Sequence, residues 1–387
     1  MKKTIEDIDV NGKRVLMRVD FNVPLHKGII ADDRRIKMAL PSIISVLQRG
    51  GSVTLMSHLG RPSGAGIEDE WSLKPIATRL SELLGQPVSF SDEDVTSPIV
   101  LKENLRFRSE EKNGDESYAR ELASGSDIYC NDAFGTAHRA HASMVAVPKV
   151  MEGKPRVAGL LLAKELQYLI DAVSNAKRPF VALLGGAKVS DKIGTINHLL
   201  GKVDTIVIGG AMAYTFLVAK GEDVGKSLVE LDRVEDATEM LMAAKSSSTE
   251  LLLPIDYVCA KELVQGTPVQ IVSGSIPEGW MGVDIGPETT AIFSHQILHS
   301  KTIVWNGPMG VFETTPFDVG TREIAKAIAL ATTRGATSIV GGGDTASAIS
   351  AFGLDDQMTH ISTGGGASLQ MLEGIVFSSV ALLDDAV

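Results

Sequence analysis

The chain has 387 residues, of which 44% are hydrophobic and 22% charged, so it is long enough for two α/β domains and too apolar to be disordered. Its net charge of −11 argues against a nucleic-acid-binding protein, because binding to a phosphate backbone needs an extended cationic face. No apolar run reaches the roughly 18 residues of a membrane helix, no signal peptide is recognisable, and the two cysteines, Cys130 and Cys259, indicate buried thiols in a reducing compartment. We therefore expect a cytoplasmic protein.

Short apolar runs alternate with amphipathic segments, which is the pattern of parallel β-α-β units. In the first half, we expect strands at residues 14–19, 52–56, 99–101 and 128–130, and helices at residues 36–48 and 75–84. Pro41 should kink the first of these helices or lie in one of its early turns. A long helical pattern at residues 160–176 ends at Lys177-Arg178-Pro179, and we interpret this segment, about 160–178, as a connector between two lobes.

The alternation continues in the second half. We expect strands at residues 180–184, 205–208, 251–253, 302–305, 338–340 and 360–362, and helices at residues 193–200, 234–245 and 321–331. The predicted fold is α/β, with two doubly wound parallel-sheet (Rossmann-like) lobes joined by a helix and a hinge. The predicted boundaries are residues 1–165 for the N-terminal lobe, 166–370 for the C-terminal lobe and 371–387 for a tail.

Charge is divided unequally between the halves. Residues 1–170 contain 23 basic and 23 acidic side chains, whereas residues 171–387 contain 14 basic and 25 acidic ones, and 12 of the 16 arginines lie in the first part. Guanidinium groups bind phosphates and carboxylates through two parallel hydrogen bonds, so this bias predicts a site for a small anion in the first half.

The strand ends repeat this contrast, and ligands of open α/β sheets bind at the carboxyl ends of strands. In the first half these ends carry charge: RVDFNVP (18–24), SHLGRP (57–62), KENLRF (102–107) and NDAFGTAHRAH (131–141). In the second half they carry glycine: LLGG (183–186), IGG (208–210), WNGP (305–308), GGGDT (341–345) and STGGGAS (362–368). One lobe offers arginine and the other offers glycine.

Glycine at a strand-to-helix turn lets backbone N–H groups approach a phosphate, so the second half predicts a nucleotide-phosphate site, with Asp344 available for Mg²⁺. Lys188 and Lys192 lie four residues apart beside such a turn, where ammonium groups suit a phosphoryl group in transfer. The sequence does not match the spacing of other familiar nucleotide-binding or metal-binding motifs. Residues 221–227 lack the spacing of a P-loop, no strand is followed by G-x-G-x-x-G, and His138 with His141 has no third metal ligand nearby.

Taken in order, the strings resemble the signature set of the phosphoglycerate kinase family from about residue 3 to residue 374. The strings that carry the resemblance are RVDFNVP, SHLGRP, ENLRF, NDAFGTAHRAH, LLGGAKVSDKI, GGAMAYTFL, VGKSLVE, GWMGVDIGP, WNGPMGVFE, GGGDTASAI and STGGGASL. The resemblance implies a monomeric two-lobe hinge enzyme that transfers the acyl phosphate of 1,3-bisphosphoglycerate to Mg-ADP, giving 3-phosphoglycerate and ATP.

The resemblance also implies the site residues. Phosphoglycerate would be bound by Asp20, Phe21, Asn22, Arg35, His58, Leu59, Gly60, Arg61, Arg106 and Arg139. The nucleotide would be bound by Lys192, Gly209, Gly210, Asn306, Glu313, Gly342, Gly343, Asp344 and Thr345, with Asp344 on the metal and Glu313 on the ribose. Stabilisation of the phosphoryl group in flight would come from Lys188, Arg35 and the N–H groups of Gly365 and Gly366.

The implied tail, residues 371–387, returns to the N-terminal lobe, although the segment 375–379 reads IVFSS where the family usually has Lys-Leu-Pro-Gly. In the ATP-consuming direction the nucleophile is a carboxylate, already ionised at pH 7, so no general base is required. Water must be excluded from a labile acyl phosphate, so we expect the lobes to close around both ligands.

Two other interpretations compete with this one. A different acyl-phosphate kinase, such as an acetate or carbamate kinase, would not need the basic cluster, because its substrate lacks a second phosphate. A non-catalytic two-lobe anion-binding protein would leave Lys188 and the glycine turns without a purpose.

Overall fold

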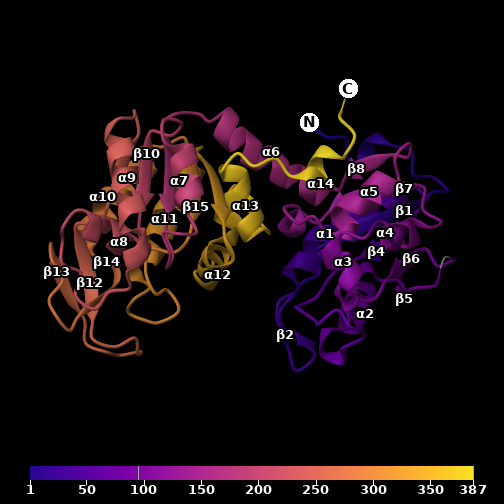
Figure 1. Cartoon of the computed structure of the whole chain (residues 1–387), viewed down its shortest axis with the longest axis horizontal. Coiled ribbons are helices and arrows are strands. Elements are labelled where there is room, and N and C mark those ends of the chain that lie inside the picture. The colour runs from indigo at the N-terminus through magenta and orange to yellow at the C-terminus, as the bar shows by residue number, and fades with distance from the viewer. Residues whose placement is uncertain (95, 387) are drawn as a thin grey trace. The chain divides into compact units, whose positions relative to one another are not determined.

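The computed structural model describes residues 1–94 and 96–386, with the backbone alone described for residues 171–174 (Figure 1). Its internal contacts divide the chain into unit 1, residues 1–167 and 376–387, and unit 2, residues 168–375. Each unit contains its own six-stranded sheet and its own apolar core. Among the described residues, no helix is long and apolar enough to cross a membrane.

Unit 1 is built on a parallel sheet with the strand order β5-β6-β4-β1-β7-β8. The strands are β1 (Arg14–Val19), β4 (Ser52–Met56), β5 (Ser89–Phe90), β6 (Ile99–Leu101), β7 (Ile128–Asp132) and β8 (Arg156–Ala158). In the centre, Met17 of β1 pairs with Leu55 on one side and with Cys130 on the other. The chain adds strands on one side of β1 first and then, from β7, on the other, so the sheet has a topological switch point between β1 and β7.

The helices of unit 1 surround this sheet. They are α1 (Arg34–Gln48), α2 (Lys74–Leu84), α3 (Ser109–Asn113), α4 (Glu116–Ala123), α5 (Val147–Val150) and α14 (Ser378–Ala381). Of the two alternatives for Pro41, the early turn is wrong, because α1 begins at Arg34 and continues past Pro41 to Gln48, and the kink stays a prediction. Pro41 lies on the exposed side of the helix, while Ile36 and Ile43 pack into the core, so burial of the apolar face outweighs the helical hydrogen bond that proline cannot donate.

The long helix α6 (Leu160–Ser174) begins in unit 1 and ends in unit 2, four residues before the predicted end of the connector. Two side chains hold its first turn. Asp132, at the end of β7, accepts the Leu162 N–H at 3.1 Å, and Ser42 of α1 accepts the Leu160 N–H at 2.8 Å. Burial raises the pKa of Asp132 to about 6, although its hydrogen bonds with the Ser42 side chain and the Leu162 N–H act in the opposite direction. The N-terminus of α6 is therefore anchored to the core of unit 1.

Unit 2 has a parallel sheet with the strand order β11-β10-β9-β15-β16-β17. The strands are β9 (Phe180–Leu184), β10 (Thr205–Ile208), β11 (Glu250–Leu252), β15 (Thr302–Asn306), β16 (Thr337–Gly341) and β17 (His360–Ile361). The order reverses between β9 and β15, where Val304 pairs with Ala182. This is the strand order of a doubly wound dinucleotide-binding sheet.

Two groups of helices accompany this sheet. In one, α7 (Ile193–Leu199) contacts α9 (Val234–Lys245) and α13 (Gly365–Leu372), while α8 (Met212–Ala219) packs on α9. In the other, α11 (Val319–Thr333) contacts α10 (Pro287–His299) and α12 (Gly343–Ala351). With parallel sheets in both units, the predicted α/β fold class is confirmed.

Several strands were not expected from the sequence. Unit 2 contains a three-stranded antiparallel sheet of β12 (Asp256–Ala260), β13 (Gln270–Ser273) and β14 (Met281–Ile285), and unit 1 contains the hairpin β2 (Leu25–His26) and β3 (Ile29–Ile30). They are short or carry polar residues among the apolar ones, so they lack the continuous apolar run that marks a buried parallel strand.

The described C-terminal residues, 376–386, pack on the rest of unit 1. The Lys3 N–H donates to the Asp384 carbonyl at 2.8 Å, the Arg156 N–H donates to the Asp384 carboxylate at 2.9 Å, and Lys2 forms an ion pair with Asp385 at 2.9 Å. Leu383 is 2% exposed. The segment is thus held by backbone and side-chain groups of the N-terminal residues and of β8.

Candidate active site

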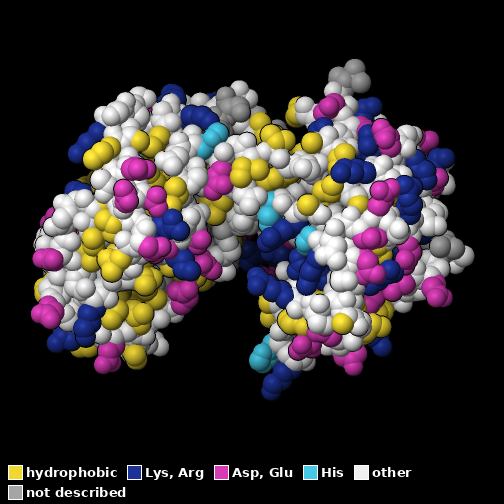
Figure 2. All heavy atoms as spheres, viewed as in Figure 1, with side chains coloured by type: hydrophobic (Ala, Val, Ile, Leu, Met, Phe, Trp, Pro, Cys, Tyr) yellow, Lys and Arg dark blue, Asp and Glu magenta, His cyan; other side chains and the backbone are white. Residues whose placement is uncertain are grey.

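The charged residues predicted in the first half lie at the carboxyl ends of neighbouring strands of unit 1. Asp20 and Asn22 follow β1, residues 58–61 follow β4, Arg106 lies in the turn Leu105–Phe107 after β6, and Arg139 lies beyond β7. Since parallel strands end at the same edge of a sheet, these segments come together there. Figure 2 shows Lys, Arg and His side chains concentrated on one part of the surface of unit 1.

Several of these residues hold one another. Arg35, in the first turn of α1, donates to Asp20 at 2.9 Å. The Asn22 side chain accepts the Gly60 N–H at 2.9 Å, and Arg106 donates to the Gly60 carbonyl at 2.8 Å. The loops after β1, β4 and β6 are therefore connected through direct hydrogen bonds.

The Asn104 side chain forms hydrogen bonds with the loops after β4 and β6. Its side-chain oxygen accepts the N–H groups of Leu59 and Arg106 at 3.2 and 3.1 Å, and its nitrogen donates to the carbonyls of Leu59 and Trp71 at 2.8 and 2.9 Å. Asn104 is 3% exposed, so these bonds are shielded from water. It fixes the backbone that carries His58 and Arg106.

The predicted residues differ in how accessible they are. Arg61 and Arg139 are exposed, Arg35 and Arg106 are half-buried, and His58 is buried. Phe21 and Leu59 have side chains in the core of unit 1, so only their backbone atoms face the loops. Their predicted role is thus limited to the backbone.

The positive charges of this cluster act on its histidines. Burial, reinforced by Arg18 and Arg106, lowers the pKa of His58 well below its usual range. Burial and the same two arginines also lower the pKa of His141 to about 4, and burial lowers the pKa of Arg106 to about 10. Nearby cations make a further positive charge unfavourable, which is the electrostatic state of a site suited to a multiply charged anion.

Four members of this cluster were not among the predicted site residues, although Arg18 and His141 lie within the quoted strings RVDFNVP and NDAFGTAHRAH. Arg18, Glu111, Ser143 and His141 are buried or nearly so and lie among the predicted residues. Arg18 could have been found as an arginine next to the last residue of β1, RVLMRV, where it follows three apolar residues. Glu111 gave no such signal, because the string SEEKN around it reads as a solvent-exposed helix.

In unit 2, the loops after β9, β10 and β15 approach one another through backbone atoms. The Gly186 N–H donates to the Pro308 carbonyl at 3.0 Å, and the Gly210 N–H donates to the Met309 carbonyl at 3.0 Å. A Cβ atom on Gly307 would overlap the backbone of Gly185, and Gly307 has a φ of +101°. Glycine is therefore required at this switch point by both space and conformation.

Lys192 and Asn306 meet at the same place. The Lys192 ammonium donates to the Asn306 side chain at 2.5 Å, and both side chains are buried. Thr345, one residue after Asp344, accepts the Gly307 N–H at 2.7 Å. Burial lowers the pKa of Lys192 to about 8, while Asp191 and Asp344 partly offset that effect. The structure thus brings together three of the predicted nucleotide-binding residues.

Two helix N-termini adjoin this cluster. Helix α12 begins at Gly343 and α13 at Gly365, and a Cβ atom on Gly365 would lie 3.2 Å from the Gly342 Cα atom. The first N–H groups of a helix have no partner within that helix, so two such termini side by side offer donors to phosphate oxygens. Asp344 is exposed in the first turn of α12.

Lys188 and Glu313 are exposed. The loop that carries Lys188 is held by Glu230, a residue outside that loop. Glu230 accepts both the Ser190 hydroxyl at 2.6 Å and the Ser190 N–H at 3.0 Å. The Glu230 N–H in turn donates to Thr215 of α8 at 3.1 Å. Glu230, which sequence reasoning also missed, ties the lysine-bearing loop to the neighbouring helix.

Comparison with known proteins adds independent information. The model of the phosphoglycerate kinase family matches residues 5–375. Phosphoglycerate kinases from Rhodopirellula baltica and Chloroherpeton thalassium are 55% and 50% identical, each with full coverage of both chains. The structure of phosphoglycerate kinase from Coxiella burnetii aligns with a TM-score of 0.91 and 39% identity, covering 99% of this chain and 98% of that one.

The chain belongs to the phosphoglycerate kinase family. Members of this family are enzymes that transfer phosphate to or from 3-phosphoglycerate, so the predicted family and enzyme class are confirmed. A more distant structure, phosphoglycerate kinase from Pyrococcus horikoshii, aligns with a TM-score of 0.84 and 32% identity over 99% of this chain. The interpretations as another acyl-phosphate kinase or as a non-catalytic binding protein lose their support.

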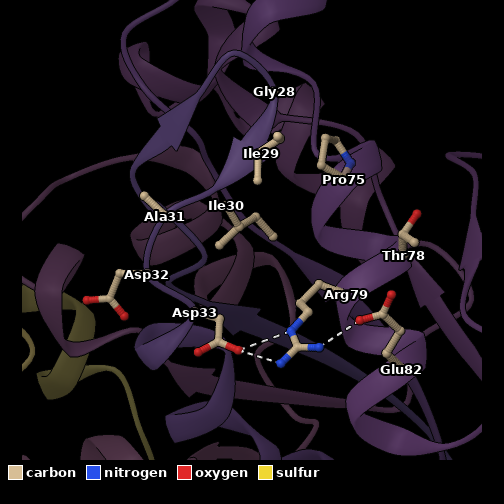
Figure 3. A pocket seen from close by; sticks show the side chains of 10 residues that line it. All are labelled: Gly28, Ile29, Ile30, Ala31, Asp32, Asp33, Pro75, Thr78, Arg79 and Glu82. Carbon is tan, nitrogen blue, oxygen red and sulfur yellow. Dashed lines mark hydrogen bonds and ion pairs between the residues drawn. The ribbon is translucent and has the colours of Figure 1, made fainter.

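A separate hollow of unit 1 contains none of the predicted phosphoglycerate kinase residues. It has a volume of about 650 Å³ and lies between the β2–β3 hairpin and α2. Figure 3 shows Arg79 there between Asp33 and Glu82, with hydrogen bonds of 2.8–3.0 Å to Asp33 and 2.7 Å to Glu82. Because one arginine faces two carboxylates there, the hollow lacks the positive field of the strand-end cluster.

Proposed function

We propose that this chain catalyses reversible transfer of the acyl phosphate of 1,3-bisphosphoglycerate to ADP, with phosphoglycerate bound by unit 1 and the nucleotide by unit 2. The observation that carries this assignment is the basic cluster of unit 1, where burial and the neighbouring arginines lower the pKa values of His58 and His141. Such a cluster suits a ligand that carries both a phosphate and a carboxylate.

In unit 1, the proposed ligand-binding groups are the residues that the family resemblance implies. They are Asp20, Asn22, Arg35, His58, Arg61, Arg106 and Arg139, with backbone atoms of Phe21, Leu59 and Gly60. The hydrogen bond of Arg35 to Asp20 and that of Arg106 to Gly60 pre-orient two guanidinium groups before a ligand arrives. Preorganised donors lose less conformational entropy on binding.

In unit 2, the proposed nucleotide groups are Lys192, Gly209, Gly210, Asn306, Glu313, Gly342, Gly343, Asp344 and Thr345. The buried Lys192 and the N-terminus of α12 would meet phosphate oxygens, and the exposed Glu313 would meet the ribose hydroxyls. The proximity of Lys192 to Asn306 supports this placement.

The chemistry needs no general base. In the ATP-consuming direction, a carboxylate oxygen of 3-phosphoglycerate forms a bond to the γ-phosphorus while the bond to the ADP oxygen breaks. Lys188, Arg35 and the N–H groups of Gly365 and Gly366 would stabilise the charge on the transferring group. The low pKa of His141, about 4, makes that side chain a poor base at neutral pH, which agrees with this scheme.

Asp344 is suited to contribute to a magnesium site. Its carboxylate is exposed at the N-terminus of α12, and no group of three or more His, Cys, Asp or Glu side chains in the described part of the chain could hold a metal by itself. Mg²⁺ commonly takes one or two carboxylates and completes its ligands with substrate phosphates and water. When bound, the ion would neutralise charge on the nucleotide phosphates.

Transfer requires the two ligands to meet, so closure of the lobes around a hinge near residues 160–178 stays part of this proposal. A cytoplasmic monomer is also proposed. Small-angle scattering with and without both ligands tests closure, and light scattering on the purified protein tests the oligomeric state. Absence of compaction with both ligands bound would contradict the hinge.

The decisive experiment measures ADP formation from Mg-ATP and 3-phosphoglycerate, with a trap for the acyl phosphate, in wild type, Lys188→Ala and Lys226→Ala. We expect Lys188→Ala to lower kcat by about two orders of magnitude or more, because it removes charge stabilisation in the transition state. Lys226 is an exposed lysine outside the proposed site and is the matched control. Equal activity of Lys188→Ala and wild type would move the catalytic role elsewhere, and an inactive wild type that still binds ATP would contradict the function.

A further inference from the structure

Arg18 is the most deeply enclosed cation of unit 1. It lies near the end of β1, is 0% exposed, and uses all three of its guanidinium nitrogens. Nε donates to the Ser143 hydroxyl at 2.9 Å, one terminal nitrogen donates to the Val19 carbonyl, and the other lies 3.1 Å from Nδ1 of His58. A buried guanidinium held on three sides cannot turn to bind a ligand, so its role differs from that of the exposed arginines.

The contact with His58 determines where the imidazole carries its proton. A guanidinium group only donates hydrogen bonds and stays protonated in proteins. Nδ1 of His58 must therefore accept, and an imidazole nitrogen that accepts carries no proton. The single proton of a neutral ring then lies on Nε2, and adding a second proton would break the bond to Arg18.

We propose that Arg18 is a positioning residue that holds His58 as an uncharged hydrogen-bond donor with its proton on Nε2. This inference rests on the proposed function, in which His58 binds phosphoglycerate. The free Nε2–H would then donate to a phosphate or carboxylate oxygen of the ligand. In this arrangement His58 neither gives up nor takes up a proton during binding.

A buried chain behind Arg18 supports this assignment. The Ser143 hydroxyl, which accepts from Arg18, donates to Glu111 at 2.6 Å, and the Ser143 N–H donates to the same carboxylate at 2.9 Å. The Tyr129 hydroxyl donates to the Ser143 carbonyl at 2.9 Å. Glu111 is 0% exposed, so its carboxylate lies in the interior beside Ser143. The chain from Glu111 through Ser143 both orients Arg18 and offsets its charge.

Four titratable groups around His58 oppose its protonation. They come from four separate elements or loops: Arg18 from β1, Arg35 from α1, Arg106 from the turn after β6 and His141 from the loop after β7. Burial is the largest cause of the low pKa of His58, and these four groups act in the same direction. Burial and the neighbouring arginines therefore keep the His58 ring neutral, and the hydrogen bond from Arg18 determines which nitrogen carries the proton.

The direct test is nitrogen NMR of the full-length protein labelled with ¹⁵N-histidine, with His58→Gln used to assign the His58 signals. We expect the signals of an unprotonated Nδ1 and a protonated Nε2 from pH 5.5 to pH 8. Addition of 3-phosphoglycerate should leave the protonation state of both nitrogens unchanged. A proton on Nδ1, or protonation of His58 within this pH range, would overturn the proposal. The measurement on wild type does not require substitution of Ser143 or Glu111, the residues that hold Arg18.

A second test uses Ser143→Ala, with Ser117→Ala on the exposed side of α4 as the matched control. Loss of the hydroxyl frees Arg18 Nε, so we expect mixed tautomers of His58 and a rise of about tenfold in KM for 3-phosphoglycerate, with a smaller change in kcat. An unchanged tautomer and an unchanged KM in a folded Ser143→Ala protein would contradict the role of Ser143. Wild-type activity separates the two questions: an inactive wild type refutes the proposed function, whereas an active wild type with the wrong tautomer refutes only this inference.

Discussion

Unit 1 and unit 2 place their candidate ligand-binding residues at the same position of the same kind of sheet but use different chemical groups. In unit 1 the switch point between β1 and β7 is surrounded by arginine and histidine side chains, and buried polar side chains support them: Asn104 accepts the Arg106 backbone N–H, and Glu111 accepts from the Ser143 hydroxyl that holds Arg18. In unit 2 the switch point between β9 and β15 is formed by backbone atoms, and the requirement is the absence of a Cβ atom. Unit 1 should therefore be most sensitive to removal of a polar side chain, and unit 2 to addition of a methyl group.

The largest effect on the free energy of unfolding is expected when a single methyl group is added at the switch point of unit 2. Gly307→Ala would place a Cβ atom on the backbone of Gly185 at a φ of +101°, so we expect a loss of about 3–5 kcal/mol in the free energy of unfolding. Gly335→Ala is the matched control, because Gly335 has a φ of +94° but nothing within 4 Å of its Cβ position, and should lose about 1–2 kcal/mol. Urea unfolding of both variants measures the difference. Equal losses would show that conformation alone, and not close approach, requires glycine at the switch point.

In unit 1 the corresponding change is Asn104→Ala. It removes four shielded hydrogen bonds and leaves their backbone partners unsatisfied, so we expect a loss of about 2–4 kcal/mol in the free energy of unfolding. KM for 3-phosphoglycerate should rise by about tenfold or more, because the loops that carry His58 and Arg106 lose their common support. Asn113→Ala, at an exposed helix end, should change either quantity little. A normal KM in a destabilised Asn104→Ala protein would separate stability from loop positioning.

Side chains also support loops of unit 2, and Glu230 holds the loop of Lys188. Glu230→Ala removes both acceptors of Ser190, and we expect kcat to fall by about tenfold while the affinity for ADP changes little. Glu230→Gln keeps one acceptor oxygen and should lie between wild type and Glu230→Ala. Glu235→Gln, on the exposed side of α9, is the control. Loss of ADP affinity in step with kcat would mean that Glu230 supports the whole nucleotide site and not the lysine loop.

The smallest effect concerns pH. Since the pKa of Lys192 is lowered to about 8, its ammonium loses its charge as pH rises above that value, and ADP binding measured by calorimetry should weaken by up to about tenfold per pH unit. Lys192→Arg stays charged and should lack this dependence. Persistence of the same pH dependence in Lys192→Arg would assign it to another group.

The effect of the same group on folding has the opposite sign. Between pH 8 and the unfolded pKa of about 10.5, the unfolded chain binds one more proton at Lys192 than the folded chain does, so this lysine makes stability rise with pH. Comparison of unfolding free energies for wild type and Lys192→Met at pH 7.5 and pH 9.5 isolates this contribution. A constant difference between the two proteins would contradict the lowered pKa.

Most of the two parallel sheets could be predicted from the sequence. Strands such as Phe180–Leu184 are continuous apolar runs because both faces of a parallel sheet are covered, and the residues that follow them mark the edge where ligands bind. Elements without such a run were missed. β13 alternates between half-buried and exposed residues, and α8 is buried on nearly all sides and so shows no helical periodicity.

Local sequence therefore determined the fold class, the family and the positions of the polar segments in the chain. Only the tertiary structure decided which charged side chains are enclosed and what they contact. Arg18, His58, Glu111 and Ser143 come from four separate segments, and Lys192 is buried against Asn306, 114 residues away. Burial and neighbouring charge, which set the proton state of these groups, depend on atoms brought together across the sheet, and no local pattern in the chain records them.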